Sequence, residues 1–246
     1  MDALDLDFEA AIKRHTNPPF VTYMLARTRY FDDSLEEAVQ DGARQVVILG
    51  AGFDSRGYRF HDRLRRVRFF EIDYGPTQEH KKQRVKQILG SIPAQVRYIA
   101  MDFTKDDLLA QLRKGGYSDK EKTLFISEGV FSYLPESAVK EAFRFVGDHS
   151  ASGSTIAFSY ILSKHPDVNN PNSRFARMGE PFLFGFPGES ATEFVKREGL
   201  EVVFDASSGD VLDKYLKRKT GTPPLPPLAH TQATMTGFCT ARVATK

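Results

Sequence analysis

The hydrophobic positions of this chain follow two alternating periods. Short apolar runs, rich in β-branched and aromatic residues, predict successive strands at 46–49, 67–72, 96–100, 123–126 and 154–160. Apolar residues at helical spacing predict the intervening helices at 77–89, 105–114, 135–147 and 191–198. Strands that alternate with helices are typical of βαβ units, so we predict an α/β fold with a parallel, doubly wound sheet.

Further periodic segments flank this region on both sides. Helical patterns precede it at 2–16 and 20–40. Two more strands, at 200–204 and 237–243, follow it and bracket a helix near 211–219. We therefore expect a single domain over the whole chain, with a helical N-terminal extension.

Two stretches keep no regular period. Residues 162–188 contain asparagine, proline and glycine, which predicts a long excursion after the fifth strand. Such excursions at strand ends often form lids, so we expect a substrate lid over 162–190 and a helical cap over 1–42. The proline-rich stretch 221–230 is expected to be a connector.

Composition and charge narrow the class of protein. A chain of 246 residues with 41% hydrophobic and 27% charged residues is ordinary for a globular protein, and a net charge of +2 gives no case for nucleic acid or an anionic membrane. The single Cys239 excludes a disulfide framework. No apolar run forms a signal core or reaches membrane-spanning length. We expect a soluble, cytoplasmic protein without a DNA or membrane partner, and its oligomeric state stays open.

Four consecutive predicted strands end in residues suited to one ligand. Gly50 and Gly52 end the first strand, and a backbone without Cβ atoms can approach a ligand closely. Asp73 ends the second, about 20 residues on, the distance typical of an acid that binds ribose hydroxyls. Met101-Asp102-Phe103 and Ser127-Glu128-Gly129 end the third and fourth. Because such ends meet at one edge of a parallel sheet, we predict an adenosine-containing ligand there.

Two of these acids leave alternatives open. Asp102 beside the Phe103 ring suits the amino group and the face of an adenine, although Asp73 and Asp102 are each alternatively helix caps. Glu71 competes with Asp73 for the ribose, and strand alternation is expected to turn one of the two inward.

Linked stretches of the sequence resemble one known family. GAGFDSRGYR, FEIDYGPTQEHK, MDFTKDD and SEGVFSYLPESAV are similar, in this order, to the motifs of the S-adenosylmethionine-dependent leucine carboxyl methyltransferase-like family, which includes bacterial O-methyltransferases. ARTRYFDD at 26–33 and GEPFLFGFPGE at 179–189 extend the resemblance. It implies a class I methyltransferase fold, Rossmann-like, with a seven-stranded, mostly parallel sheet, an antiparallel last strand and helices on both faces.

The resemblance also implies roles for individual residues. Gly50 and Gly52 would approach the methionyl part of S-adenosylmethionine, Asp73 would hold its ribose, and Asp102 the adenine amino group. Glu128 would lie beside the cofactor.

Two further positions are implied as catalytic. Arg27 matches an arginine that reaches the cofactor's carboxylate and the acceptor, and Tyr133 matches a tyrosine that faces the acceptor carboxylate. The acceptor itself is expected to be a small molecule or peptide-like; the family also handles protein C-termini, modified tRNA bases and secondary metabolites.

The first glycine turn favours this cofactor over a dinucleotide. The dinucleotide pattern G-x-G-x-x-G needs a glycine where this chain has Ser55. A pyrophosphate is anionic and would be repelled by the neighbouring Asp54, whereas S-adenosylmethionine carries no phosphate. Asp54 is alternatively a helix cap. Arg56 and Arg59 are interpreted as a solvated or salt-bridged face.

Charge also bears on the acceptor. A carboxylate is ionised at neutral pH, so methyl transfer to it needs neither a general base nor a metal. A hydroxyl acceptor would need a base, for which His165 and Glu128 are the candidates. The sequence contains no H-x-x-x-H or clustered Cys/His pattern. We therefore predict an O-methyltransferase, with no metal, that acts on a carboxylate.

Two other classes of protein stay open. An NAD(P)-dependent oxidoreductase would use a similar sheet, but the chain has Ser55 in the fingerprint and no Tyr-x-x-x-Lys pair after the fourth strand. A non-catalytic cofactor-binding protein would keep the same motifs without turnover.

Overall fold

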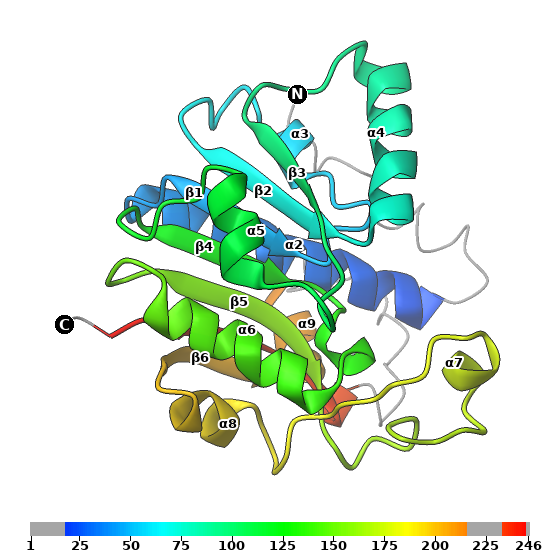
Figure 1. Ribbon diagram of the computed structural model, residues 1–246. Coiled ribbons are helices and arrows are strands. Elements are labelled where there is room, and N and C mark those ends of the chain that lie inside the picture. Colours follow the sequence, from blue (N-terminus) through cyan, green and yellow to red (C-terminus); the bar gives the residue numbers. More distant parts are fainter. Residues whose placement is uncertain (1–17, 216–232, 245–246) are drawn as a thin grey trace, which may run out of the picture.

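The computed structural model describes residues 18–215 and 233–244. Its strands form one seven-stranded sheet in the order β3-β2-β1-β4-β5-β7-β6 (Figure 1). The strands are β1 Gln45–Leu49, β2 Arg68–Asp73, β3 Val96–Ala100, β4 Thr123–Ser127, β5 Thr155–Ile161, β6 Glu201–Ser207 and β7 Thr236–Arg242. Only β7 runs antiparallel to its neighbours, β5 and β6. The predicted seven-stranded sheet with its antiparallel last strand is confirmed.

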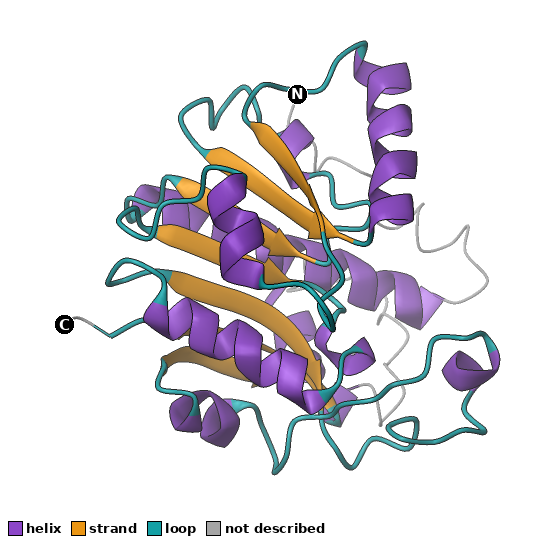
Figure 2. Cartoon of the chain, in the orientation of Figure 1, coloured by secondary structure: helices purple, strands orange, loops and turns teal. Residues whose placement is uncertain are grey.

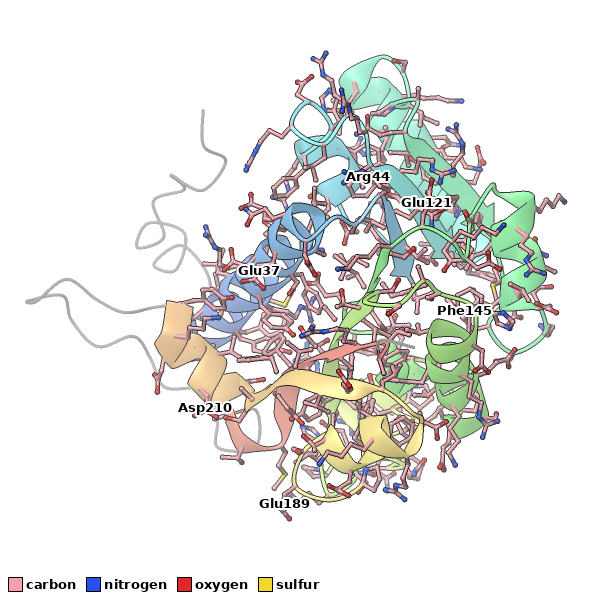
Figure 3. The ribbon with its side chains drawn as sticks, turned by 90° about the vertical axis from the view of Figure 1, so that its left-hand side faces the viewer. Glu37, Arg44, Glu121, Phe145, Glu189 and Asp210 are labelled. Carbon is pink, nitrogen blue, oxygen red and sulfur yellow. The ribbon has the colours of Figure 1, made fainter. Side chains whose placement is uncertain are left out.

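Helices cover both faces of the sheet (Figure 2). They are α2 Pro18–Gln40, α3 Arg56–Arg59, α4 Gly75–Leu89, α5 Leu108–Lys114, the 3₁₀ turn η1 Phe131–Tyr133, α6 Glu136–Asp148, α7 Arg174–Arg177, α8 Thr192–Arg197 and α9 Ser208–Tyr215. Figure 3 looks along the sheet, with Glu37 of α2 on one side and Phe145 of α6 on the other. Because both faces are covered, β1 and β4 are buried along their whole length, which explains their continuous apolar runs.

Two apolar cores lie on the two faces. One packs α5, α6 and α8 against the sheet through side chains such as Leu112, Phe143 and Phe194. The other packs α2 and α9 through side chains such as Phe31 and Val211. The amphipathic periods that predict these helices follow from this arrangement, since each helix buries one side.

The sequence-based boundaries hold to within a few residues for every described strand and for α2, α4, α5, α6 and α8. The predicted helix 211–219 is found as α9, as far as it is described. α3, η1 and α7 were not predicted, because elements of three or four residues show no period. The predicted helix 2–16 and the proline-rich stretch 221–230 lie outside the described residues.

The excursion after β5 folds back onto its own start. Isolated bridges join Leu162 to Phe186 and Val168 to Phe182. Phe184 and Phe186 are buried in the core that α5, α6 and α8 form with the sheet, which we call the main core. There the ring centroids of Phe186 and Phe194 are 4.9 Å apart. These aromatic side chains therefore fasten the excursion to the body of the domain.

No described helix has the length and apolar character needed to cross a lipid bilayer.

Candidate functional site

Four neighbouring parallel strands, β3, β2, β1 and β4, have their carboxyl ends side by side, and we call this end of the sheet its carboxyl edge. The register pairs Leu49 with Ile72, Asp73 with Ala100 and Ile48 with Ile126, so these ends are level. The strand order reverses between β1 and β4, and ligands of open α/β sheets bind outside the strand ends at such a point. The structure thus brings the predicted site residues of all four strands to one edge.

The glycine turn after β1 is shaped by two different neighbours. At Gly50, where φ is +64°, an added Cβ would lie 2.5 Å from Cγ2 of Val130, so Val130 fills the space that the missing side chain leaves. At Gly52 the nearest atom to an added Cβ is Oδ2 of Asp73, 4.0 Å away. The open side of the turn is therefore at Gly52, whereas Gly50 is required by packing.

Asp73 is oriented by the backbone around it. The Gly52 amide donates to its Oδ2, and the Tyr74 amide donates to its Oδ1 at 2.6 Å. Each carboxylate oxygen keeps a further lone pair, which a vicinal diol can use. Asp73 is thus a preorganised acceptor at the edge of the site, beside the open side of the turn.

Glu71 lies on the same side of β2 as Asp73, one pleat deeper. It is fully buried, its Oε2 lies 2.7 Å from Nζ of Lys81, and Tyr58 donates to it at 3.1 Å. Burial raises the pKa of Glu71 to about 7, against the opposing effect of the Lys81 ammonium. The expectation that one of the two acids lies inward is confirmed for Glu71, but alternation is not the cause, because residues two apart share a face and differ here in depth.

Asp102 stands at the tip of β3 in a turn of its own. Its Oδ1 accepts from the amide and the hydroxyl of Thr104 at 2.9 and 2.7 Å, and Nζ of Lys105 lies 2.6 Å from Oδ2. The hydrogen bonds from Lys105 and Thr104 lower the pKa of Asp102. Phe103 packs, half-buried, against the main core. Within the described residues no hydrogen bond or ion pair joins Asp102 to the other strand tips.

Glu128 and Arg27 meet although they are far apart in the sequence. Nε of Arg27, on α2, donates to Oε1 of Glu128 at 2.8 Å, and both side chains are partly exposed. The Arg27 guanidinium carbon also lies 5.7 Å from the ring centroid of Tyr23. α2 therefore carries an arginine to the switch point of the sheet, next to the acid that ends β4.

Arg56 of α3 is buried beneath this pair, with 4% of its side chain exposed. Its Nε donates to Oδ1 of Asp32 at 2.9 Å, and its Nη1 donates to Oε2 of Glu128 at 2.8 Å. Nη1 also donates to Asp54. Of the two alternatives for Arg56, a solvated or a salt-bridged residue, the structure shows the salt-bridged one, in a buried position. Arg59, part-exposed, donates to Asp32 at 2.8 Å.

The charge of Asp54 has a different role from the one expected. Its Oδ1 accepts from the Arg56 amide at 2.7 Å, and its Oδ2 pairs with the Arg56 guanidinium. Because Arg56 compensates it, Asp54 is not a free negative charge that would repel a pyrophosphate. The Gly52 amide bears on the choice of ligand instead, since Asp73 already accepts from it and it is therefore not available to a phosphate.

Tyr133 lies where the excursion meets η1. Its ring is 5.2 Å from that of Phe182, edge to face, and the Leu183 amide donates to the Ser132 carbonyl at 2.7 Å. Burial raises the pKa of Tyr133, the Glu180 carboxylate adds to this, and Arg27 opposes it. Tyr133 is therefore a neutral phenol on the excursion side, within electrostatic reach of Arg27.

His165, a candidate base, lies in the same part of the excursion. Its ring is 6.3 Å from that of Phe182, and its Nδ1 accepts from the Asp167 amide at 3.2 Å. Burial lowers the pKa of His165, against the opposing effect of Asp167. The neutral ring thus carries its proton on Nε2, and its one basic nitrogen is already engaged.

Sequence reasoning missed Asp32 as a site-forming residue. Asp32 is almost completely buried and binds two arginines, although it falls inside the stretch ARTRYFDD that carries the resemblance. Nothing in the sequence alone indicates that α2 and α3 pack together. Among the described residues, no group of three or more His, Cys, Asp or Glu side chains is arranged to hold a metal ion.

Comparison with known proteins identifies the class of this fold and site. The family description "leucine carboxyl methyltransferase" matches residues 2–147, and the chain belongs to this family. A Mycolicibacterium smegmatis relative is 39% identical over 150 residues, which cover 61% of this chain and 47% of that protein. A Mycobacterium tuberculosis relative is 35% identical over 165 residues, covering 66% and 51%. Both relatives are provisionally named S-adenosyl-L-methionine-dependent methyltransferases, and the chain spans about half their length.

Solved structures support the same fold. A provisionally named methyltransferase from Thermobifida fusca matches 96% of this chain and 86% of its own, with a TM-score of 0.63 at 13% identity. A DUF574 family protein from Streptomyces avermitilis matches 96% and 89%, with a TM-score of 0.62 at 15% identity. The expected class I methyltransferase fold is confirmed.

Proposed function

We propose that this protein is an O-methyltransferase that uses S-adenosylmethionine and acts on a carboxylate of a small or peptide-like acceptor. Bound S-adenosylmethionine supplies a methyl group on a cationic sulfur. The single observation that carries the cofactor assignment is the hydrogen bond from the Gly52 amide to Asp73 at the level strand ends. The amide of the glycine turn is bound to a carboxylate that can accept from ribose hydroxyls, so this amide is not available to a phosphate.

The residues at this edge fit a phosphate-free nucleoside. Asp73 would bind the ribose hydroxyls and Gly52 would lie against the methionyl part. Asp102, once Lys105 turns away into solvent, would accept from the adenine amino group, with Phe103 near the ring. Gly50 would act indirectly, by letting Val130 pack beneath the turn.

Arg27 is the residue that would face two carboxylates. Its Nε donates to Glu128, which holds one side of the guanidinium in place. A guanidinium suits a carboxylate of the cofactor and one of the acceptor, because its donors form a planar fork. Tyr133 of η1, a neutral phenol, would donate to the acceptor carboxylate. Residues 162–190 of the excursion would form the wall of the acceptor site.

The two candidate bases favour a carboxylate acceptor. Arg27 and Arg56 each occupy one oxygen of Glu128, and the basic nitrogen of His165 accepts from a backbone amide. A proton on Glu128 would neutralise the partner of two arginines, and a proton on Nδ1 of His165 would displace its hydrogen bond. An acceptor that is ionised at neutral pH needs no such transfer. Arg27 and Tyr133 would then only have to orient the acceptor carboxylate toward the methyl group. Such orientation lowers the activation barrier by roughly 7–11 kcal/mol in well-aligned reactions.

The chemical stability of the product tests this proposal. The protein is incubated with S-adenosylmethionine labelled in the methyl group and a panel of matched carboxylic acids and phenols. We expect label to enter the carboxylic acids as methyl esters, which release volatile methanol in mild alkali. Label that survives alkali as a methyl ether, on the phenols alone, would contradict the carboxylate assignment. Arg27→Lys is expected to reduce ester formation strongly, with Arg65→Lys, an exposed arginine outside the proposed site, as the matched control.

A further inference from the structure

We infer that Arg56 is a positioning residue that fixes Arg27 at the site through Glu128. The inference rests on the proposed function for its biological meaning, since Arg27 is the proposed carboxylate-binding group. The contact that carries it is a chain of ion pairs from Arg56 to Glu128 to Arg27, each with an N–O distance of 2.8 Å.

Glu128 divides its two oxygens between the two arginines. Oε1 accepts from Nε of Arg27, and Oε2 accepts from Nη1 of Arg56. A carboxylate held on one side only can rotate about its last bonds, whereas one held from both sides has a single orientation. The direction of Arg27 therefore depends on the arginine on the far side of Glu128.

Arg56 in turn is immobilised by its own partners. Asp32 binds its Nε, Asp54 binds its Nη1, and the Thr28 carbonyl accepts from its Nη2 at 3.4 Å. These groups come from α2 and from the glycine turn, so Arg56 joins both elements to the tip of β4. Its burial means that a partner lost here is not replaced by water.

Exposure increases along the chain of ion pairs toward the site. The exposed fraction of the side chain is 4% at Arg56, 16% at Glu128 and 19% at Arg27. The buried end is thus rigid and the accessible end is available to a ligand. A ligand-binding residue has to be accessible, and the residue that supports it has to be held in place, so this gradient suits the two roles.

A lysine cannot replace Arg56 in this role. An ammonium is a single point of charge, and it lacks the planar fork that reaches carboxylates in separate directions. In Arg56→Lys at least one of Asp32, Asp54 and Glu128 loses its contact with residue 56. Arg63→Lys is the matched control, because Arg63 also joins the loop after α3 to α2, through Glu36 at 2.8 Å, but it is 63% exposed and does not contact Glu128.

The first measurement needs no ligand. The Nε–H signal of Arg27 is identified in ¹⁵N spectra of the full chain by its loss in Arg27→Lys. We expect Arg56→Lys to shift or broaden this signal and Arg63→Lys to leave it in place. An unchanged Arg27 signal in folded Arg56→Lys would overturn the inference. If Arg56→Lys does not fold, Asp32→Asn, which removes one Arg56 partner at constant volume, is measured with the same expectations.

The second measurement is a double-mutant cycle on S-adenosylhomocysteine binding by calorimetry. Arg56→Lys and Arg27→Lys are each expected to raise the dissociation constant about tenfold. The dissociation constant of the double variant is expected to be no higher than that of the weaker-binding single variant. If the fold-changes in the dissociation constant of the two single variants multiply in the double variant, Arg56 acts independently of Arg27 and the inference is overturned. A wild-type protein that ignores S-adenosylhomocysteine would instead contradict the proposed function, and the Arg27 signal would still decide the role of Arg56.

Discussion

Individual residues at the strand tips serve packing and ligand chemistry in different proportions. Gly50 and Gly52 are indistinguishable as letters in a glycine motif, yet Gly50 makes room for Val130 while Gly52 binds Asp73. Asp73 and Glu71 are both acids of β2, yet one is at the edge and the other is buried against Lys81. Residue type and spacing indicate where a site lies, and the surroundings decide what each residue does there.

The Gly50 position gives a prediction on stability. Gly50→Ala places a Cβ 2.5 Å from Val130 at a positive φ, so it combines overpacking with backbone strain. We expect a loss of about 2–4 kcal/mol in the free energy of unfolding, measured by urea denaturation. Gly90→Ala is the control, because its φ is +76° but no atom lies within 4 Å of the added Cβ. Equal losses in the two variants would rule out a packing role for Gly50.

Glu71 gives a prediction on pH. Its pKa in the folded state is about 7, mainly through burial, against an ordinary value of 4.5. Between these values the folded protein binds a proton that the unfolded chain releases, so the contribution of Glu71 to stability falls as pH rises from about 4.5 to 7. The side-chain carboxyl signal of Glu71, assigned by its loss in Glu71→Gln, is expected to titrate near pH 7. Titration near 4.5 would contradict the burial argument.

At the scale of elements, α2 is joined to the sheet by charge as well as by apolar packing. Asp32 receives Arg56 and Arg59, while Arg27 reaches Glu128 from the same helix. Apolar side chains such as Phe31 and Leu35 supply the packing on the same helix. The helix that carries the proposed carboxylate-binding arginine is therefore fixed in register relative to the strand tips.

This arrangement predicts unequal effects of two substitutions on α2. Asp32→Ala leaves Arg56 partly uncompensated in a buried place, and we expect it to cost about 3–5 kcal/mol of folding stability. Glu36→Gln breaks only the exposed pair with Arg63 and is expected to cost less than about 1 kcal/mol. Chemical denaturation measures both variants. A cost for Asp32→Ala as small as that for Glu36→Gln would show that the buried ion pairs do not hold α2.

The elements also show what a sequence can predict. The strands and the longer helices follow from their periods, because burial of one or both faces imposes those periods. α3 has four residues and no period, yet it supplies Arg56. The contact between Asp32 and Arg56 spans 24 residues and depends on how α2 crosses α3. Long-range pairing of charges leaves no local pattern, so the site residues were predictable at the strand tips and not beneath them.

At the scale of the whole molecule, the proposed site residues lie together at the carboxyl ends of the strands of one sheet. Level strand ends present Gly52, Asp73 and Asp102, α2 brings Arg27, and η1, which packs against the excursion, brings Tyr133. A surface pocket of about 330 Å³ lies at the opposite ends of the strands, beside the amino ends of β1 and β2, and Arg44 is among its lining residues. Figure 3 labels Arg44. The family match, the fold and the direction of the strands all indicate the carboxyl edge as the proposed site.

Binding of S-adenosylhomocysteine to the wild-type chain, measured by calorimetry beside NADH, tests the central claim most directly. We expect one molecule of S-adenosylhomocysteine to bind per chain and NADH not to bind. Asp73→Asn is expected to weaken the affinity by about 1–3 kcal/mol, because it loses charge-assisted hydrogen bonds. Binding of NADH in place of S-adenosylhomocysteine, or equal affinity in a folded Asp73→Asn variant, would contradict the account.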